Sequence, residues 1–242
     1  MTDKVNMTMT NNWHKLWERK TLATEKPDLA TLISMVGWKT KDGDLSEQEW
    51  LEFVRFVAEK LNISSGDIIF EIGCGPGGFL LPFYEKGHAI TGLDYSESLI
   101  EICRQIMPSG DFHYGEANLL PLPDQSFDII FSNSVCHYFP DHDYSERVLS
   151  EISRCLKSGG RGAILDANDA SKRNAFLEHR YERFGGKVEY DEQNQDLPQL
   201  FYDKDWFVNT GAKYGLIGYT EDQSIEWYRN TPFRFNYFFS KQ

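Results

Sequence analysis

Apolar residues along the chain follow two alternating patterns. Short, nearly continuous apolar runs at residues 67–72, 89–94, 112–114, 127–133 and 162–166 are typical of buried parallel strands. Between these runs, apolar residues recur every three or four positions, which indicates helices that bury one face. This alternation predicts an α/β fold, with a doubly wound, mostly parallel sheet that carries helices on both faces.

Local signals mark several of the helices. Ser46 and Glu49 form a Ser-x-x-Glu capping box, and the apolar positions that follow predict a helix ending near residue 62. Trp13, Leu16 and Trp17 share one helical face, which predicts a short amphipathic helix near the N-terminus. Further helices are expected between the strands: one ending near residue 87, one at 96–107, and one ended by the glycine pair at 159–160.

The C-terminal third has a different character. Residues 167–203 are polar, aromatic and irregular, and we expect a helix at 171–184 followed by a loop. After a helix at 205–214, two β-like runs at 216–219 and 233–239 are close enough in sequence to pair as an antiparallel edge. We therefore expect an N-terminal helical lid at 1–45 and a main domain at 46–242, in which 167–203 forms a substrate-lid insertion.

Composition and charge narrow the range of partners. Hydrophobic residues make up 40% of the 242 residues, enough for one domain with a substantial core. Lys and Arg total 25 against 37 Asp and Glu, which gives a net charge of −12, and no basic run offsets this excess. Because a duplex-binding protein needs a cationic surface, nucleic acid is not expected as a partner, and a small-molecule substrate is.

Location and metal binding are constrained by what the sequence lacks. The four cysteines form no CxxC pair and no cluster with zinc spacing, so reduced thiols and no metal site are expected. The N-terminal residues lack the apolar segment of a signal peptide, and no apolar run approaches the roughly 18 residues of a membrane span. We expect a cytoplasmic protein that does not bind membranes and is a monomer or a homodimer.

The first strand is followed by the most informative segment, the glycine-rich sequence at 73–78. Glycines there allow a sharp turn and a close approach of the backbone to a ligand. Asp94 ends the second strand 21 residues after Gly73. A carboxylate at that place can accept hydrogen bonds from both ribose hydroxyls of an adenosine. The combination predicts an adenosine-containing cofactor at the first crossover of the sheet.

Two cofactor classes compete for this site. Gly73, Gly75 and Gly78 satisfy the GxGxxG pattern of dinucleotide-binding proteins, so a nicotinamide-dependent oxidoreductase is one alternative. Glu71 favours a cationic ligand, because its carboxylate would repel a pyrophosphate. Pro76 also removes a backbone N–H that a pyrophosphate would use. These residues favour S-adenosylmethionine (SAM).

The segments at the ends of the strands resemble the successive motifs of class I, Rossmann-like SAM-dependent methyltransferases. They are EIGCGPG at 71–77, GLDYS at 92–96, GEANLLP at 115–121, SFD at 126–128, NSVCHYFPD at 133–141 and LKSGG at 156–160. The resemblance covers residues 66–166 in the order and spacing of the family. It implies a sheet of about seven strands whose last strand is antiparallel. It also implies a SAM-dependent methyltransferase that yields S-adenosylhomocysteine (SAH), with a non-catalytic SAM-binding regulatory module as a further alternative.

The family pattern assigns roles to individual residues. The turn that includes Gly73, Cys74, Gly75 and Gly77 would offer its backbone to the methionine part, next to Glu71. Asp94 would hold the ribose and Tyr95 would pack on the adenine. Glu116 stands where the family usually has an Asp that bonds the adenine amino group. The remaining implied contacts are backbone contacts, from Ala117 to the adenine ring and from Ser132 and Asn133 to the methionine part.

Methyl transfer to a hydroxyl usually needs a base, and His137 is the candidate because it follows the fourth strand at the ligand-binding edge. If the pKa of its imidazole is unperturbed, activity should decrease as the pH falls below about 6.5. Tyr138, beside it, could orient substrate, and the alternative for His137 is a structural role at the start of the next helix. The acceptor is expected to be an O or N atom of a natural-product or saccharide intermediate.

The substrate wall is expected to come from the two lids. Their aromatic residues could cover the sulfonium and stack on a flat or saccharide substrate, or simply pack the lids against the sheet. Arg180, Arg183 and Lys187 could meet an anionic group, or form a solvated helix face. The aromatic residues chosen as substrate contacts are Trp13, Trp17, Phe176, Tyr181 and Tyr202.

Overall fold

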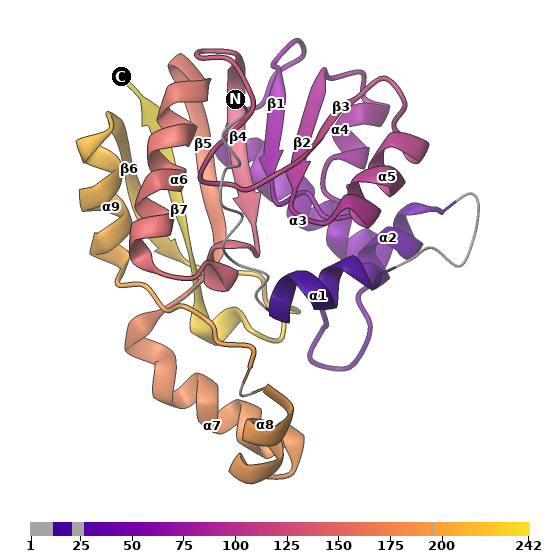
Figure 1. The fold of residues 1–242 in the computed structure, drawn as a ribbon, viewed down its shortest axis with the longest axis vertical. Coiled ribbons are helices and arrows are strands. Elements are labelled where there is room, and N and C mark those ends of the chain that lie inside the picture. The colour runs from indigo at the N-terminus through magenta and orange to yellow at the C-terminus, as the bar shows by residue number, and fades with distance from the viewer. Residues whose placement is uncertain (1–11, 21–26, 195) are drawn as a thin grey trace, which may run out of the picture.

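The computed structural model describes residues 12–20, 27–194 and 196–242. Its centre is a seven-stranded sheet in the order β3-β2-β1-β4-β5-β7-β6 (Figure 1). The strands are β1 (Ile69–Ile72), β2 (Ile90–Asp94), β3 (Asp111–Tyr114), β4 (Phe127–Asn133), β5 (Leu156–Asn168), β6 (Leu216–Asp222) and β7 (Arg234–Lys241). Neighbours from β3 to β5 are parallel, whereas β7 is antiparallel to both β5 and β6. The predicted Rossmann-like architecture is confirmed.

Helices cover both faces of the sheet because successive strand residues point to opposite sides. Ile69 and Ile129 pack with α3 (Glu47–Lys60), α4 (Leu81–Glu85) and α5 (Glu97–Ile106). Phe70 and Ile130 pack on the other face with α6 (His142–Cys155) and α9 (Lys204–Lys213). The capping box at the start of α3 is present in full.

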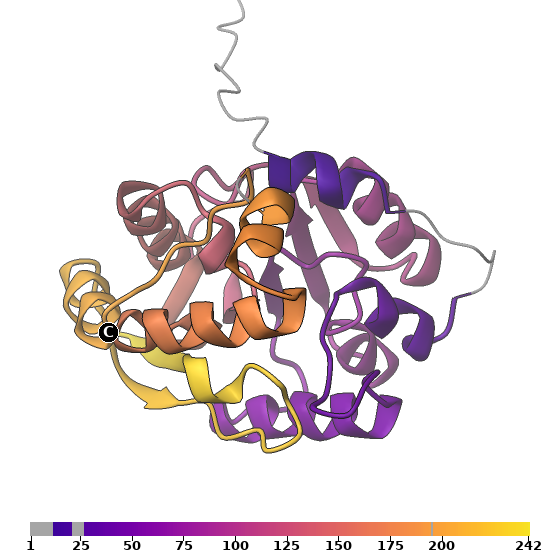
Figure 2. The same cartoon turned by 90° about the horizontal axis from the view of Figure 1, so that it is seen from below.

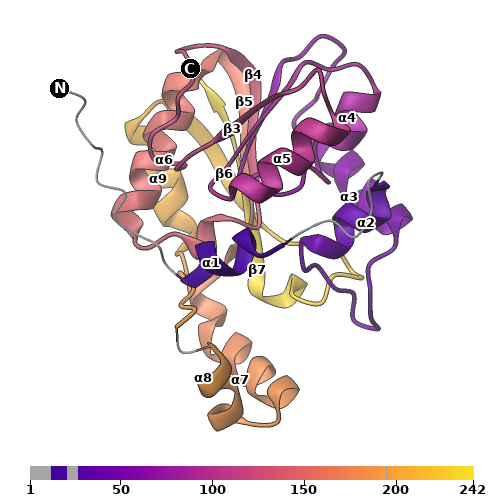
Figure 3. The same ribbon diagram turned by 45° about the vertical axis from the view of Figure 1, so that its right-hand side comes forward.

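The remaining helices lie at the carboxyl ends of the parallel strands. Figure 2 looks at this edge and shows α1 (Asn12–Glu18), α7 (Arg173–Phe184) and α8 (Lys187–Asn194) in front of the strand ends. Figure 3 shows α1 crossing beneath the sheet while α7 and α8 project below it. Of the N-terminal lid expected at 1–45, residues 1–11 and 21–26 lie outside the described residues. The described part also contains α2 (Leu29–Met35) and the short 3-10 helices at Cys136–Tyr138, Ala170–Lys172 and Thr231–Phe233.

Two expectations about these elements are wrong. Helix α6 ends at Cys155, not at the glycine pair, because Leu156 is already extended and pairs with Phe127 of β4. Gly159, with φ +75°, lies instead in the irregular part of β5, where the register between the two strands shifts. The loop expected after α7 contains helix α8, which contacts α7 through edge-to-face packing of Tyr190 against Tyr181 and Phe184. That segment has few apolar residues, so its periodicity gives no helix signal.

Among the described residues, no helix is both long enough and apolar enough to span a bilayer.

Candidate functional site

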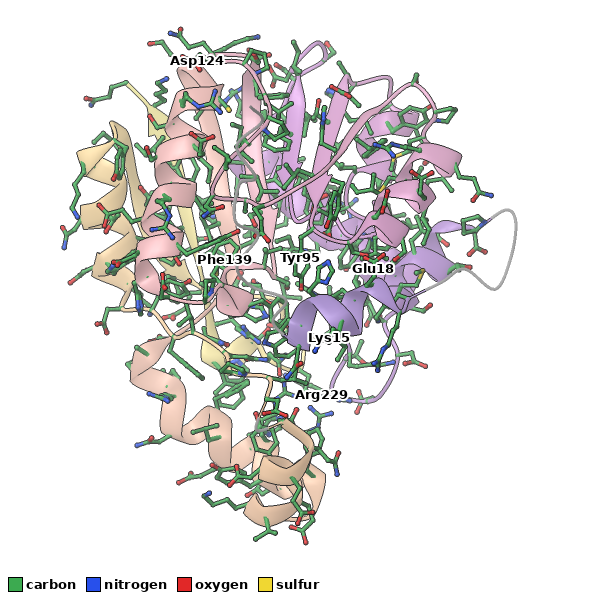
Figure 4. All side chains as sticks on the ribbon, in the orientation of Figure 1. Lys15, Glu18, Tyr95, Asp124, Phe139 and Arg229 are labelled. Carbon is green, nitrogen blue, oxygen red and sulfur yellow. The ribbon has the colours of Figure 1, made fainter. Side chains whose placement is uncertain are left out.

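A cavity of about 780 Å³ lies at the carboxyl edge of the sheet. Its lining comes from the ends of β1, β2, β4, β5 and β7, and from α1 and α7. This is the edge where open α/β sheets bind their ligands. In Figure 4, Tyr95 and Arg229 lie at this edge, whereas Asp124 lies at the opposite end of the sheet.

The glycine turn after β1 forms one side of the cavity. Gly73 and Gly75 have φ of +72° and +53°, in the left-handed region that favours glycine. A Cβ on Gly73 would come within 2.4 Å of the Val135 side chain. The Gly75 N–H donates to Asp94 Oδ2 at 2.8 Å, which fastens the turn to the end of β2. Gly73, Cys74 and Gly75 line the cavity, as the family pattern implies.

Asp94 is buried at the end of β2 and lines the cavity beside the turn. Its other oxygen, Oδ1, accepts the Ser96 N–H at 2.9 Å. Burial raises the pKa of Asp94 to about 6, although the backbone hydrogen bonds act in the opposite direction. Tyr95 follows it, with its ring edge-to-face against His14 of α1. Asp94 and Tyr95 therefore both line the cavity beside the glycine turn.

Glu71 is the unusual group in this half of the cavity. Its side chain is only 2% exposed, and Oε2 has no hydrogen-bond partner among the described residues. Burial raises the pKa of Glu71 well above its ordinary value, and the nearby Cys103 and Asp94 raise it further. A buried carboxylate without a partner is costly unless a ligand supplies the opposite charge. The ammonium of SAM would meet this need.

These two raised pKa values predict that binding is linked to protonation. Ribose hydroxyls and an ammonium both favour the ionised carboxylates, so ligand binding should release protons near neutral pH. We expect SAH affinity to fall about tenfold or more from about pH 7.5 to about pH 5, because Asp94 is protonated as pH falls through about 6. Calorimetry in buffers of different ionisation enthalpy measures the protons released, and Glu71→Gln should reduce their number. A pH-independent affinity would contradict these assignments.

Some of the other residues expected to contact the cofactor line the cavity, and others do not. Glu116, Ala117 and Asn133 line the cavity. Glu116 Oε2 accepts the Tyr144 hydroxyl at 2.6 Å, so part of its hydrogen-bonding capacity is already used. Gly77 and Ser132 are absent from the lining. A Cβ on Gly77 would come within 2.4 Å of the Met107 side chain, so this glycine permits the close packing of α5.

His137 lies in the short 3-10 helix Cys136–Tyr138 that follows β4; it is fully buried and lines the cavity. Arg234 Nη1, at the start of β7, lies 3.2 Å from His137 Nδ1. Because a guanidinium can only donate, Nδ1 accepts and the remaining ring proton is placed on Nε2. Burial lowers the pKa of His137 well below its ordinary value, and the positive charges of Arg234 and Arg180 lower it further. The expectation of a pKa near 6.5 is therefore wrong.

Tyr138, the residue after His137, packs against helix α1. Its ring packs against Trp13 with centroids 4.4 Å apart and against Trp17 at 6.0 Å. Burial raises the pKa of Tyr138 to about 12, and Arg234 acts in the opposite direction. The Trp13 indole donates to the Pro198 carbonyl at 2.8 Å, so α1 is joined to the segment after α8. Of the two tryptophans, Trp17 lines the cavity and Trp13 packs behind Tyr138.

The other expected substrate contacts lie away from the cavity lining. Tyr202 is a core residue, fully buried, whose hydroxyl donates to the Cys136 carbonyl at 2.7 Å. Phe176 is also fully buried and supports two arginine side chains, and Tyr181 packs against Tyr190 of α8. The residues chosen from the aromatic composition are therefore packing residues. Composition alone does not show which face of a helix meets the cavity.

Sequence reasoning missed a polar centre at the ends of β4, β5 and β7. Asp166 ends the expected fifth strand, and its Oδ2 accepts hydrogen bonds from Ser134 at 2.5 Å and Tyr228 at 3.0 Å. Asp166 Oδ1 lies 3.6 Å from Arg234 Nε. Both Ser134 and Asp166 have positive φ, of 59° and 61°, and such strained residues cluster at functional sites. The position of Asp166 at a strand end was the available signal.

Within the described ranges, no group of three or more His, Cys, Asp and Glu residues could hold a metal ion.

The comparisons with known proteins agree with this geometry. Residues 70–164 match the family model described as a methyltransferase domain. The chain is 33% identical over 119 residues to the phthiotriol/phenolphthiotriol dimycocerosates methyltransferase of Mycobacterium leprae, covering 48% of this chain and 43% of that protein. It is 31% identical over 117 residues to the demethylmenaquinone methyltransferase of Listeria welshimeri, covering 45% and 48%. The aligned part therefore spans about half the length of these curated relatives.

A solved structure extends the similarity of fold. The geranyl diphosphate C-methyltransferase of Streptomyces coelicolor A3(2), in complex with Mg²⁺, geranyl diphosphate and SAH, superposes with a TM-score of 0.59 at 16% identity. The match covers 79% of each chain. Residues 70–164 thus match a methyltransferase domain, and the chain has the Rossmann-like fold of this solved methyltransferase.

Proposed function

We propose that this protein transfers a methyl group from SAM to an O or N atom of a small molecule, a natural-product or saccharide intermediate. The observation that carries the proposal is the unpartnered, buried Glu71 beside the glycine turn and Asp94 on one side of a single cavity. A carboxylate for an ammonium, a second carboxylate for ribose hydroxyls and an open backbone turn fit SAM. A dinucleotide pyrophosphate would meet the repulsion of Glu71 instead.

SAM, when bound, would supply a methyl group on a sulfonium. The residues of this chain would do the rest by alignment and by exclusion of water. Glu71, Asp94 and the backbone of Gly73–Gly75 would hold the cofactor. The backbone of Asn133, which lines the cavity, would lie along the methionine part.

We further propose that the acceptor lies between the glycine turn and the Asp166 centre, next to His137. The order of the strands supports this place, since β4 separates β1 from β5. His137 is a poor proton acceptor there, because an imidazolium would form beside Arg234 and Arg180. Its role would be to donate a hydrogen bond from Nε2 to the acceptor molecule.

The parts of the chain at 1–45 and 167–203 would act as lids. Helix α1 supports this assignment through contacts on both sides of the cavity: Ser98 Oγ of α5 donates to the Glu18 carbonyl at 3.0 Å, and Trp13 bonds Pro198. A helix held in this way shields the cofactor half of the cavity from water. Within the first lid, these contacts come from α1.

The proposal predicts turnover with SAM alone as the cofactor. Incubation of the full chain with methyl-labelled SAM and a small-molecule extract should transfer label to a low-mass product and form SAH. EDTA should leave the rate unchanged, since no residue group with metal-ligand spacing is expected from the sequence. A protein that binds SAM but forms no SAH with any fraction would be a regulatory module. Activity lost in EDTA and restored by magnesium would contradict metal independence.

A further inference from the structure

Arginines are concentrated in one half of the cavity lining. Glu71, Asp94 and Glu116 lie in the cofactor half, at the ends of β1 and β2 and after β3. The opposite half, below β5 and β7, is lined by arginines from α7, from the segment before β7 and from β7 itself: Arg180, Arg183, Arg229 and Arg234. A concentration of cations is unexpected in a chain with a net charge of −12. It therefore needs a specific explanation.

Arg234 is held rigidly at the base of this arginine cluster. It is only 3% exposed, and Nη1 donates to both His137 Nδ1 and the Asp166 carbonyl at 3.2 Å. Its Nε has no hydrogen-bond partner among the described residues. The guanidinium groups of Arg234 and Arg180 lie 5.6 and 5.1 Å from the ring centroid of Phe176. A single buried ring thus supports two of the four arginines.

The protein itself neutralises little of this charge. Within the described residues, Asp166 is the carboxylate that pairs with Arg234, and no carboxylate forms an ion pair with Arg180, Arg183 or Arg229. Burial lowers the pKa of Arg180 and Arg183, and neighbouring arginines lower both further. Elsewhere on the lining, Lys39 pairs with Asp44, and Arg147 lies over the Tyr144 ring.

We propose that the methyl acceptor carries a phosphoryl group, bound by the arginine cluster of Arg180, Arg183, Arg229 and Arg234. The inference rests on the proposed function and names its substrate class. Four arginines less one aspartate leave three positive charges, which match a phosphate or diphosphate better than a single carboxylate. The planar guanidinium fork suits the oxygens of a phosphoryl group. The arginine cluster would thus hold the anionic end while the acceptor atom reaches the methyl group past His137.

Pyrophosphate and succinate are suitable probes because they carry the two competing kinds of oxyanion. Calorimetry on the SAH-saturated full chain should show pyrophosphate binding that weakens with added salt, and weaker binding of succinate. Arg180→Ala and Arg229→Ala should each weaken pyrophosphate binding at least about tenfold, since each removes charged hydrogen bonds. Arg55→Ala, an exposed arginine of α3 outside the cavity, is the matched control and should change nothing.

The outcomes separate this inference from the proposed function. SAH affinity measured on the same variants should be unchanged, which shows that they are folded and that the cofactor half is intact. Absence of pyrophosphate binding to the SAH-saturated chain, or binding insensitive to both arginine variants, would overturn the phosphoryl site. Tighter binding of succinate would overturn it in favour of a carboxylate substrate. Failure of SAH itself to bind would instead overturn the proposed function.

Discussion

Replacing Asp94 with alanine is expected to weaken SAM binding by about 1–3 kcal/mol, which is roughly a fivefold to 150-fold loss of affinity. The variant removes the charged acceptor for the ribose hydroxyls. It also removes the carboxylate oxygens that accept the Gly75 N–H and the Ser96 N–H. Calorimetry with SAM and SAH measures the effect directly.

Two further variants make this result specific. Asp94→Asn keeps an acceptor oxygen but loses the charge, so its affinity should fall between those of the wild type and Asp94→Ala. Asp124→Ala removes an exposed carboxylate at the opposite end of the sheet and should bind SAM as the wild type does. Unchanged affinity in a folded Asp94→Ala protein would show that the ribose does not lie at the end of β2.

Replacing His137 with alanine is expected to lower turnover by about 10²-fold or more, the scale seen when one oriented donor is removed from an active site. SAM affinity should barely change, because the ring faces the acceptor rather than the cofactor in our account. The variant also leaves the Arg234 guanidinium without its partner at Nδ1. Steady-state turnover with the acceptor, together with SAH calorimetry, separates loss of chemistry from loss of folding.

His137→Gln distinguishes a hydrogen-bond donor from a general base. The glutamine amide can accept from Arg234 and donate into the cavity, but it cannot take up a proton. We therefore expect His137→Gln to keep much more turnover than His137→Ala. We also expect the pH profile of wild-type turnover to show no inflection near about 6.5, because burial and two arginines lower the pKa of His137. Equal loss in both variants, with such an inflection, would restore the general-base interpretation.

The cofactor half of the cavity could be predicted because its geometry is local. The glycine turn and Asp94 belong to one strand–turn–helix–strand unit, and parallel strands place the two ends side by side. Sequence spacing alone therefore brings Gly73, Gly75 and Asp94 together. The same logic predicted the sheet, since β7 and β6 follow each other and pair as an antiparallel hairpin.

The acceptor half could not be predicted in the same way. Arg234 meets His137 across 97 positions of sequence, because β7 inserts between β5 and β6 and places its first residue at the ligand-binding edge. Burial at this place, together with the positive charge of Arg234, lowers the pKa of His137 well below its ordinary value. The packing of Tyr202 and Phe176 in the core depends on how α7 and the following segment cover the sheet, which periodicity does not reveal. Helix α2, by contrast, had a readable signal in Asp28 as N-cap before Leu29, Leu32 and Ile33.

The central claim is that the cavity at the carboxyl edge takes SAM rather than a dinucleotide. Calorimetric titration of the full chain with SAM, SAH and NAD tests it most directly. Our account predicts that SAM and SAH bind at a single site, that Asp94→Ala weakens both, and that NAD gives no binding heat. Binding of NAD without binding of SAM would contradict the account and would make the glycine turn a dinucleotide site.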